Sequence, residues 1–444
     1  MKQYAGFLKI PIIAALCFFL NVLPSWAIVK SNTQSVYTGE YIFLAYPHKV
    51  GLTATSLKGA MVQGGSVKTA TIDTGSKPNS TNSYSWPDTA VDSQGNFHLV
   101  YIERDVSFNP ANIYNVIYRQ FKDISALGSK VILPLPNFPN YMFVPDGIAV
   151  AVSNIQGVED VYVLVYGQEM DLNKTSLHSQ IYLLKKTPTG WIQNSIYRQD
   201  LINSRLMTVS RALEFNIPIG STSAFIGFME EDRAQQVRVR GLYELIVDLN
   251  TLVVSQPLLI HKSATMPLFV NDYKRFNLEA NLNMGEFADY VEGSGFYPVK
   301  GIYFNTKFIS QNQWAPGIGQ SSVWGGDLSE PFGQGLLTYV GIRGNNPGGA
   351  DELNYYLLPA GNSWTAPGRI AFGRKYTWPV QPEGTGIPFD NYYAACIEDD
   401  QKIVLFYLDK RLNFTLVPWQ RILVDSDSAA VNQFTELDIA VYKR

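Results

Sequence analysis

The sequence predicts an all-β fold made of repeated antiparallel sheets, on three observations. A Tyr-rich apolar run leads into a polar turn and then a Trp at four places, 182–191, 303–314, 355–364 and 407–419. Such units return at intervals of roughly 50–60 residues, or twice that, and this period is typical of arrays of repeated supersecondary units. Charged residues make up 16% of the chain while Tyr and Phe are abundant, a balance that favours strands.

The N-terminal segment 1–27 has the pattern of an export signal. Lys2 and Lys9 flank the start of a mostly apolar stretch, and Ser25 and Ala27 supply the small residues of a signal-peptidase site. We expect cleavage after Ala27 and a secreted or periplasmic protein. The alternative, a membrane anchor, is disfavoured because the apolar run falls short of the ~20 residues that a spanning helix needs. No later stretch is long and apolar enough for a membrane-spanning helix.

Cleavage would leave Cys396 as the single cysteine, so we expect a fold without disulfides and a buried, inert thiol. The net charge is −3 and Lys and Arg are scattered, which argues against a nucleic-acid partner. The remaining residues, 28–444, are expected to form one domain.

The repeated unit begins with a hairpin that is clearest at 87–103. A short strand-like run at 87–91 is followed by the turn 92–96 and an alternating run at 97–103, and Gly95 and Asn96 suit a tight reversal. The pattern returns at 145–150 with 161–166, and weaker copies follow. The copies divide the chain into six expected units, at about 84–140, 141–206, 207–264, 265–326, 327–386 and 387–429.

Two fragments lie outside these units: the N-terminal one has expected strands at 41–46 and 68–73, and the C-terminal one has an expected strand at 434–442. Joined in one sheet, they would close a ring and remove the sheet edges that an open array exposes. The sequence therefore predicts a β-propeller with seven blades, the N- and C-terminal strands sharing one blade; six blades is the alternative. A short helical turn within 200–215 is also expected.

The Trp that ends each polar turn has an architectural interpretation. Gly permits the tight reversal, and a large ring just beyond it can pack between neighbouring blades, where it buries much apolar area. We therefore expect Trp191, Trp314, Trp364 and, at a looser spacing, Trp419 to be wedges between blades rather than ligand contacts.

The turn that carries Gly361, Ser363 and Trp364 resembles a degenerate Asp-box of the sialidase-like propellers, although Pro359 stands where that motif has Asp. The stretch 336–370 also resembles one blade of bacterial propeller lectins and sialidase-related proteins. The resemblance implies the fold more than an activity. It implies a possible sialidase-like site of three arginines with a Tyr, a Glu and an Asp.

The sequence offers few candidate residues for catalysis, metal binding or the binding of a charged ligand. Arg104 and Arg343 fall at equivalent strand ends and could grip an acidic sugar, or they could be surface charges. Asp88 and Asp146 share one position of the repeat, which favours a structural role over catalysis. The four His are widely spaced and no nucleophile or phosphate-loop motif occurs. We therefore predict no catalytic residue, no metal site and no cofactor.

Three tryptophans do not fall at the repeated turn, Trp86, Trp324 and Trp378, and they are better candidates for ligand contacts. The hypothesis is an exported, non-enzymatic propeller that binds a carbohydrate, as a lectin does, or another macromolecule. The alternatives are a sialidase-like glycoside hydrolase and a protein-interaction scaffold. The candidate ligand-binding residues are Trp86, Arg104, Trp324, Arg343 and Trp378.

Overall fold

The computed structural model describes the chain from residue 39 to residue 444, with gaps. The described ranges are 39–51, 54–74, 83–105, 113–136, 141–171, 176–200, 206–232, 239–262, 276–281, 285–294, 297–305, 323–329, 336–344, 351–359, 368–383 and 389–444. The expected export signal, 1–27, lies outside them. Within these ranges, no helix is both long enough and apolar enough to span a membrane.

The described strands form seven sheets in which every strand pair is antiparallel, numbered here in chain order. Sheet 1 combines both ends of the described chain: β1 (Glu40–Val50), β2 (Ala54–Gln63), β3 (Ser66–Thr74), β27 (Gln433–Phe434) and β28 (Asp438–Lys443). Sheet 2 contains β4 (Ser83–Val91), β5 (Phe97–Asp105), β6 (Ile113–Phe121) and β7 (Val131–Ile132), with the short 3-10 helix η1 (Ile124–Ala126) between the last two.

The other five sheets follow in order along the chain. Sheet 3 contains β8 (Tyr141–Ile155), β9 (Val158–Asp171), β10 (Ser176–Thr187) and β11 (Gly190–Asp200). Sheet 4 contains β12 (Leu206–Asn216), β13 (Ser223–Asp232), β14 (Val239–Asp248) and β15 (Leu258–Lys262), and sheet 5 contains β16 (Phe276–Asn281), β17 (Gly285–Ser294) and β18 (Tyr297–Asn305). Sheet 6 contains β19 (Val323–Ser329), β20 (Leu336–Gly344), β21 (Asp351–Pro359) and β22 (Gly368–Arg374), and sheet 7 contains β23 (Tyr376–Val380), β24 (Asn391–Glu398), β25 (Lys402–Asp409) and β26 (Gln420–Ser426).

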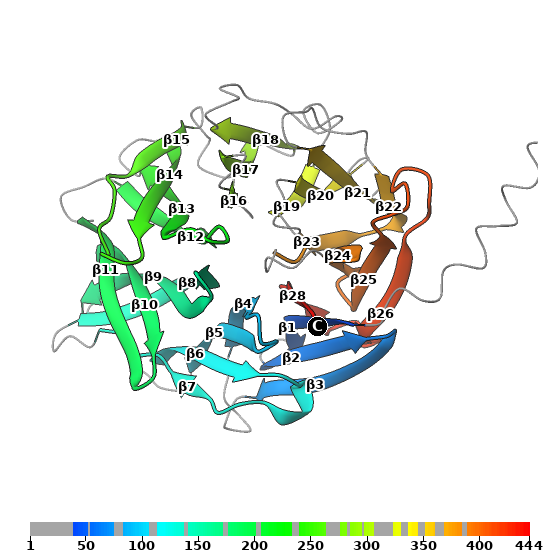
Figure 1. The fold of residues 1–444 in the computed structure, drawn as a ribbon, viewed down its shortest axis with the longest axis horizontal. Coiled ribbons are helices and arrows are strands. Elements are labelled where there is room, and N and C mark those ends of the chain that lie inside the picture. The colour runs from blue at the N-terminus through cyan, green and yellow to red at the C-terminus, as the bar shows by residue number, and fades with distance from the viewer. Residues whose placement is uncertain are drawn as a thin grey trace, which may run out of the picture.

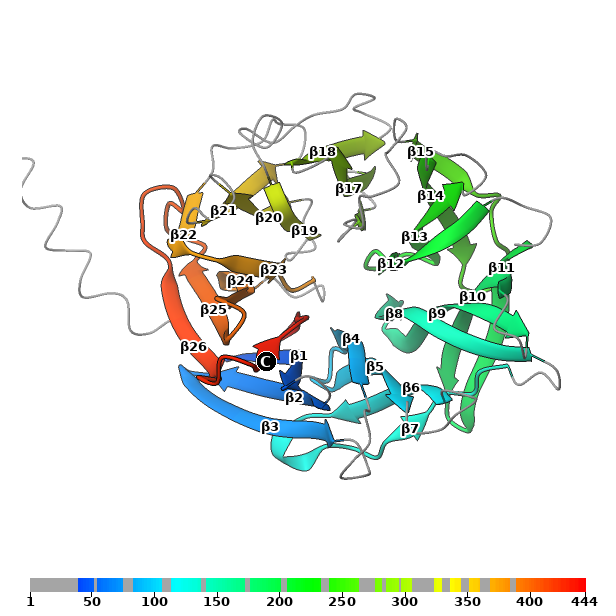
Figure 2. The same ribbon diagram turned by 180° about the vertical axis from the view of Figure 1, so that it is seen from behind.

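The sheets stand around a common centre, as Figures 1 and 2 show from opposite sides. The first strand of each sheet from 2 to 7 lies innermost, and in sheet 1 this place belongs to β28. Innermost strands of neighbouring sheets contact one another, for example β28 with β4 and β4 with β8. Antiparallel sheets arranged radially in this way form a β-propeller. The protein is therefore an all-β propeller.

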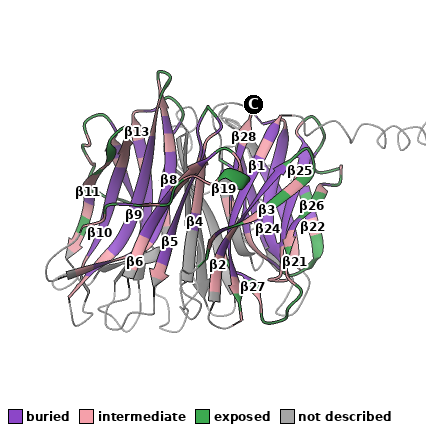
Figure 3. Cartoon of the chain, turned by 90° about the horizontal axis from the view of Figure 1, so that it is seen from below, coloured by how far each residue is buried: buried purple, intermediate pink, exposed green. Residues whose placement is uncertain are grey.

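The hydrophobic core lies between the sheets rather than in one central mass. Separate clusters of buried residues join sheets 1 and 2, sheets 2 and 3, sheets 3 and 4, and sheets 1, 6 and 7. A strand between two neighbours buries both of its faces, so β24 is buried along its whole length and reads in the sequence as a continuous apolar run. Figure 3 shows the buried residues in the body of the sheets and the exposed ones in turns and on outermost strands such as β22 and β26.

Both ends of the described chain meet in sheet 1. β28 pairs antiparallel with β1, with Leu44 opposite Ile439. Glu40, at the start of β1, is almost fully buried and accepts hydrogen bonds from Asn391 and Tyr393 of sheet 7. The prediction that N- and C-terminal strands share one sheet agrees with this pairing, although β2 was not among the expected strands.

Three expectations about strand positions were wrong. The segment 206–216 is the innermost strand β12, not part of a helical turn, because pairing with β13 outweighs a weak helical pattern. Sheet 6 begins at Val323 rather than 327, and sheet 7 begins at Tyr376 rather than 387. Their innermost strands β19 and β23 are short and contain Gly or Pro, so they lack the alternating pattern by which the other strands were found.

The architectural interpretation of the Trp turns is confirmed at both described positions. Trp191 of sheet 3 packs edge-on against Tyr118 of sheet 2, with 4.9 Å between ring centroids. Trp419 of sheet 7 is buried and lies 4.9 Å from Tyr355 of sheet 6. Trp314 and Trp364 lie outside the described residues. Cys396 is fully buried, as expected, and burial raises the pKa of its thiol.

Candidate functional site

Carboxyl side chains from four sheets come together at the centre of the propeller. Asp88 lies on β4, Asp327 on β19 and Asp438 on β28, while Glu383 lies just beyond the end of β23. Their mutual electrostatic effects show that they share one site. Asp88, Asp327 and Asp438 are half-buried and Glu383 is exposed. The four therefore form an acidic site that solvent reaches, called here the central carboxyl site.

Irregularities in the innermost strands shape this site. The pairing register shifts in β4 between Ser85 and Asp88, and in β8 between Pro145 and Gly147. It also shifts in β19 at Trp324 and in β23 at Trp378 and Pro379. Each shift interrupts the one-to-one register between the two strands and bends the strand locally. A register shift can therefore change the direction in which the side chains of an innermost strand point, compared with a regular strand.

Three of the four carboxyls also join their sheet to the next one. Asp438 accepts a hydrogen bond of 2.7 Å from the backbone N–H of Thr89, and Asp88 accepts one from the N–H of Val150. Asp327 accepts one of 2.6 Å from the N–H of Gln381. The same contact thus occurs at three junctions between sheets. The predicted structural role of Asp88 is confirmed.

Three of the central carboxyls, those of Asp88, Glu383 and Asp438, bind protons more tightly than free carboxyls do. Loss of hydration, followed by the charges of Asp438 and Asp327, raises the pKa of Glu383 to about 8. Loss of hydration also raises the pKa of Asp438 to about 7, despite the hydrogen bonds from Thr89. The pKa of Asp88 is raised for the same reason, with Asp438 as the next cause. Desolvation and like charges both disfavour the ionised form, so part of this site holds protons near neutral pH.

Glu383 differs from the other three carboxyls. It is exposed, and it makes no hydrogen bond or ion pair with another described residue. Surrounding protein removes hydration from its carboxyl, while the residue keeps contact with solvent. A protonated carboxyl with solvent access can both donate and accept hydrogen bonds. Glu383 is therefore the member of the site best placed to meet a ligand.

The two candidate arginines do not line this site. Arg104 is at the end of β5, the second strand of sheet 2, and its guanidinium stacks on Tyr114 of the same sheet, 5.2 Å from the ring centroid. Arg343 lies at the corresponding end of β20, the second strand of sheet 6. Neither is on an innermost strand, and sheets 2 and 6 are not neighbours. The backbone thus gives no sign that these two arginines converge.

The three candidate tryptophans do share a location. Trp86, Trp324 and Trp378 all lie where the register of an innermost strand shifts, in β4, β19 and β23. Trp378 is half-buried, packs against the core of sheets 1, 6 and 7, and has a φ of 56°. The other described non-glycine residues with positive φ are in turns. Bulky residues rarely adopt this conformation, so β23 holds Trp378 in a backbone conformation that is unusual for tryptophan.

Sequence reasoning did not select Glu383 or Asp438. A signal for Asp438 is present, because Asp-x-Ala-Val occurs at both 88–91 and 438–441 and marks an innermost strand each time. Glu383 has no such signal, since it lies in a segment interrupted by Pro379 and Pro382 and beyond the end of the strand ladder. Its place in the site depends on the packing of sheet 7 against sheet 6.

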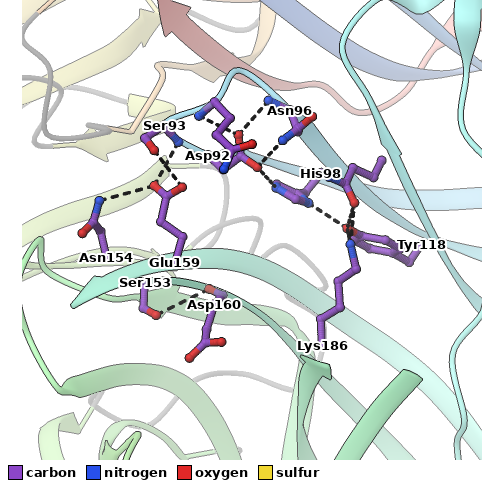
Figure 4. Close-up of polar contacts among 12 residues, drawn as sticks. Asp92, Ser93, Asn96, His98, Tyr118, Ser153, Asn154, Glu159, Asp160 and Lys186 are labelled. Atoms are coloured by element: carbon purple, nitrogen blue, oxygen red, sulfur yellow. Dashed lines mark hydrogen bonds and ion pairs between the residues drawn. The ribbon is translucent and has the colours of Figure 1, made fainter. Parts of the chain in front are cut away.

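A second polar cluster lies between sheets 2 and 3 (Figure 4). His98 contacts the Tyr118 hydroxyl through Nδ1 at 2.8 Å, and Lys186 Nζ donates to the same hydroxyl at 3.1 Å. His98 Nε2 lies 3.4 Å from a carboxylate oxygen of Asp92. Burial lowers the pKa of His98, so its ring is neutral at pH 7. Because His98 is almost completely buried, this cluster serves to join two sheets rather than to meet a ligand.

Other chemistry is sparse in the part of the chain that the structure describes. No group of three or more His, Cys, Asp or Glu residues there is arranged to hold a metal ion. The raised pKa values of Asp88, Glu383 and Asp438 make the central carboxyl site a group of proton-binding side chains, and Trp378 lies in the same segment as Glu383.

Comparison with known proteins gives distant structural likenesses only. No family model matches the chain, and no curated protein matches it. It is similar to a fucose-specific lectin from Aleuria aurantia, with 10% identity, a TM-score of 0.39, and coverage of 79% of this chain and 97% of the lectin. It is also similar to an alpha-L-arabinanase from Penicillium chrysogenum, with 11% identity, a TM-score of 0.41, and coverage of 77% and 93%. A glycoside hydrolase family 32 structure from Bifidobacterium adolescentis has 8% identity and a TM-score of 0.40, with coverage of 92% and 96%.

Proposed function

We propose that the protein is an exported seven-bladed β-propeller that binds a carbohydrate at its central carboxyl site. The signal-like N-terminus supports export. Seven described sheets and the pairing of β28 with β1 support seven blades, with the ring closed by sheet 1. Closure of this kind leaves no sheet edge free at the two ends of the array.

The observation that carries the binding proposal is the exposed, protonated carboxyl of Glu383 among three further carboxyls. Sugar hydroxyls both donate and accept hydrogen bonds, and a site with protonated and ionised carboxyls offers both partners. Trp378, in the same segment, adds an aromatic surface of the kind on which sugar rings stack.

The charge of the site indicates the class of sugar. The described groups that act on Glu383 electrostatically are carboxyls, with no cation among them. An acidic sugar would be repelled by them, whereas a neutral sugar would not. The proposed ligand is therefore a neutral carbohydrate, and among the described residues no group of arginines at the site supports the sialidase-like alternative.

A second candidate function is the hydrolysis of a neutral glycoside. It is favoured by one observation, a carboxyl with a raised pKa beside other carboxyls, which is the pairing that an acid and a base or nucleophile require. In this alternative Glu383 is the general acid and Asp327 or Asp438 is its partner.

Three Glu383 variants separate these functions. We would screen the mature chain on an array of neutral and acidic glycans and on chromogenic glycosides. Glu383→Ala should lose binding at least about tenfold, the scale of one hydrogen-bonding group. Glu383→Gln should keep binding, because an amide also donates and accepts, and should no longer weaken above pH 8. Glu159→Gln, in sheet 3, is the control and should bind as the parent does.

The outcomes are distinct. Turnover by the parent chain that Glu383→Gln abolishes while it still binds would establish the hydrolase. Binding without turnover would establish the lectin-like function. Silence of the parent on every glycan and glycoside, or equal binding by Glu383→Ala, would refute both and favour a protein-interaction scaffold.

A further inference from the structure

The segment that carries Glu383 leaves its own sheet before it reaches the central carboxyl site. The pairing of β23 with β24 ends at Val380, opposite Ala395. Residues 381–383 continue beyond this ladder, so they receive no strand pairing from sheet 7. A segment without ladder bonds needs other partners if its backbone groups are buried.

Sheet 6 supplies these partners through Gln381, which is 4% exposed. The backbone N–H of Gln381 donates to the carboxylate of Asp327 at 2.6 Å. Its side-chain amide donates to the carbonyl of Asp327 at 2.7 Å and to the carbonyl of Thr338 at 3.1 Å. Its amide oxygen accepts from the Thr338 hydroxyl at 2.8 Å. Gln381 is thereby bonded on both its backbone and its side chain.

The next residue is held from the same side. The hydroxyl of Ser329 donates to the carbonyl of Pro382 at 2.8 Å. Ser329 and Thr338 are both almost completely buried, and the proline ring restricts the backbone directly before Glu383. Two consecutive residues before Glu383 are thus fixed to β19 and β20 of the neighbouring sheet.

We propose that Gln381 is a positioning residue that holds Glu383 at the central carboxyl site, beside Asp327. The proposal rests on the proposed function, in which Glu383 contacts the ligand. Asp327 both accepts the Gln381 N–H and acts on Glu383 electrostatically. The same set of bonds therefore fixes the place of Glu383 and its distance from Asp327, a charge that adds to burial and Asp438 in raising the pKa of Glu383.

The charged neighbours of Glu383 come from three other elements. Asp327 lies on β19, Asp438 on β28 and Asp88 on β4. If the segment were released, Glu383 would move away from these carboxyls and regain hydration. Its carboxyl should then titrate like an ordinary glutamate, whose pKa is about 4.3.

The test measures the titration of Glu383 in the full mature chain by NMR, with ¹³C label in the glutamate carboxyls. Glu383→Gln identifies the signal by its loss. In Gln381→Ala the titration midpoint of Glu383 should fall by about one pH unit or more, the size of a clear environmental shift. Thr338→Val, which keeps the shape but removes the hydroxyl, should cause a smaller fall. Thr338→Ser restores a hydroxyl and should restore the midpoint.

Circular dichroism and thermal melts show which variants are folded. If Gln381→Ala does not fold, Thr338→Val and Ser329→Ala carry the same test. An unchanged Glu383 midpoint in folded variants overturns the proposal, even if glycans bind. A lowered midpoint in a chain that binds no glycan upholds the positioning role and refutes the proposed function, so the two failures are separable.

Discussion

Asp438 accepts hydrogen bonds from both the backbone N–H and the hydroxyl of Thr89, at 2.7 and 2.5 Å, across 349 residues of sequence. β28 belongs to sheet 1 and β4 to sheet 2. The contact therefore ties the last strand of the chain to the sheet that follows the N-terminal strands. Asp88 and Asp327 make the equivalent contact at two other junctions.

Removing the acceptor at this junction should destabilise the propeller. Asp438→Ala leaves the Thr89 N–H and hydroxyl without this partner, and we expect a loss of about 1–3 kcal/mol in the free energy of unfolding. Asp438→Asn keeps an oxygen that can accept and should lose less. Urea denaturation at pH 6 measures both. Equal losses in the two variants would show that the acceptor is not what matters.

The stability of the protein should fall between pH 5 and pH 8. The pKa values of Asp438 and Glu383 are raised to about 7 and about 8, so the folded state binds more protons than the unfolded state in this window. The contribution of these two carboxyls to stability is fully present below their unfolded-state pKa near 4. It is lost as the pH rises through their folded-state pKa values. Other carboxyls respond at lower pH; one is Asp92, where the nearby His98 and the hydrogen bonds from Asn96 outweigh burial and lower the pKa to about 2.

The matched variant for this pH dependence is Asp438→Asn combined with Glu383→Gln. Melting temperatures of the parent and the double variant, measured from pH 5 to pH 9, should converge at pH 5 and diverge as the pH rises. The double variant should be the more stable of the two at pH 8. Parallel curves would contradict the assignment of raised pKa values to these residues.

Replacing the two wedge tryptophans, Trp419 and Trp191, should destabilise the protein to different extents. Trp419 is 7% exposed, and Trp419→Ala should lose about 3–5 kcal/mol, as buried aromatic truncations do. Trp191 is half-buried, so Trp191→Ala should lose less. Leu416→Ala is the control, because Leu416 is 78% exposed, and a surface change of this kind usually alters stability by less than about 0.5 kcal/mol. Chemical denaturation ranks the three, and a Trp191 loss above that of Trp419 would contradict the wedge geometry.

Two turn glycines test the packing of the C-terminal strand. Gly95 and Gly157 both have positive φ, 76° and 82°, so alanine is strained at each by about 1 kcal/mol or more. A Cβ at Gly95 would also lie 2.6 Å from the ring of Tyr442, whereas the space around Gly157 is open. Gly95→Ala should therefore be the more destabilising in thermal melts. The combination Gly95→Ala with Tyr442→Ala should recover part of the difference, and no recovery would argue against the contact.

Much of the architecture could be predicted from local patterns. The hairpin at 87–103 and its copy at 145–166 have clear alternation and turn chemistry, and the strands of sheets 2 and 3 lie where these patterns place them. Prediction was poorer for β19 and β23. Glycines, prolines and register shifts in these innermost strands erase the two-residue period on which strand prediction depends.

The candidate site was harder to predict, because its members lie far apart in sequence and only Asp88 and Asp438 share a local motif. Trp86, Trp324 and Trp378 were selected because they broke the repeat, and the structure shows that they share the register shifts of innermost strands. Arg104 and Arg343 were selected for their charge and their strand ends, yet they occupy second strands. Spacing along the chain does not report which strand of a sheet is innermost.

The Trp turns and the alternating strands by themselves determined that this protein is an all-β array, because hydrophobic period and turn residues are local properties of the chain. The tertiary structure decided which carboxyls meet. Asp88, Glu383 and Asp438 acquire their raised pKa values, and Asp88, Asp327 and Asp438 their hydrogen-bond partners in the next sheet, only when separate sheets pack around one centre. Desolvation and like-charge repulsion depend on distance in space and have no counterpart in sequence spacing.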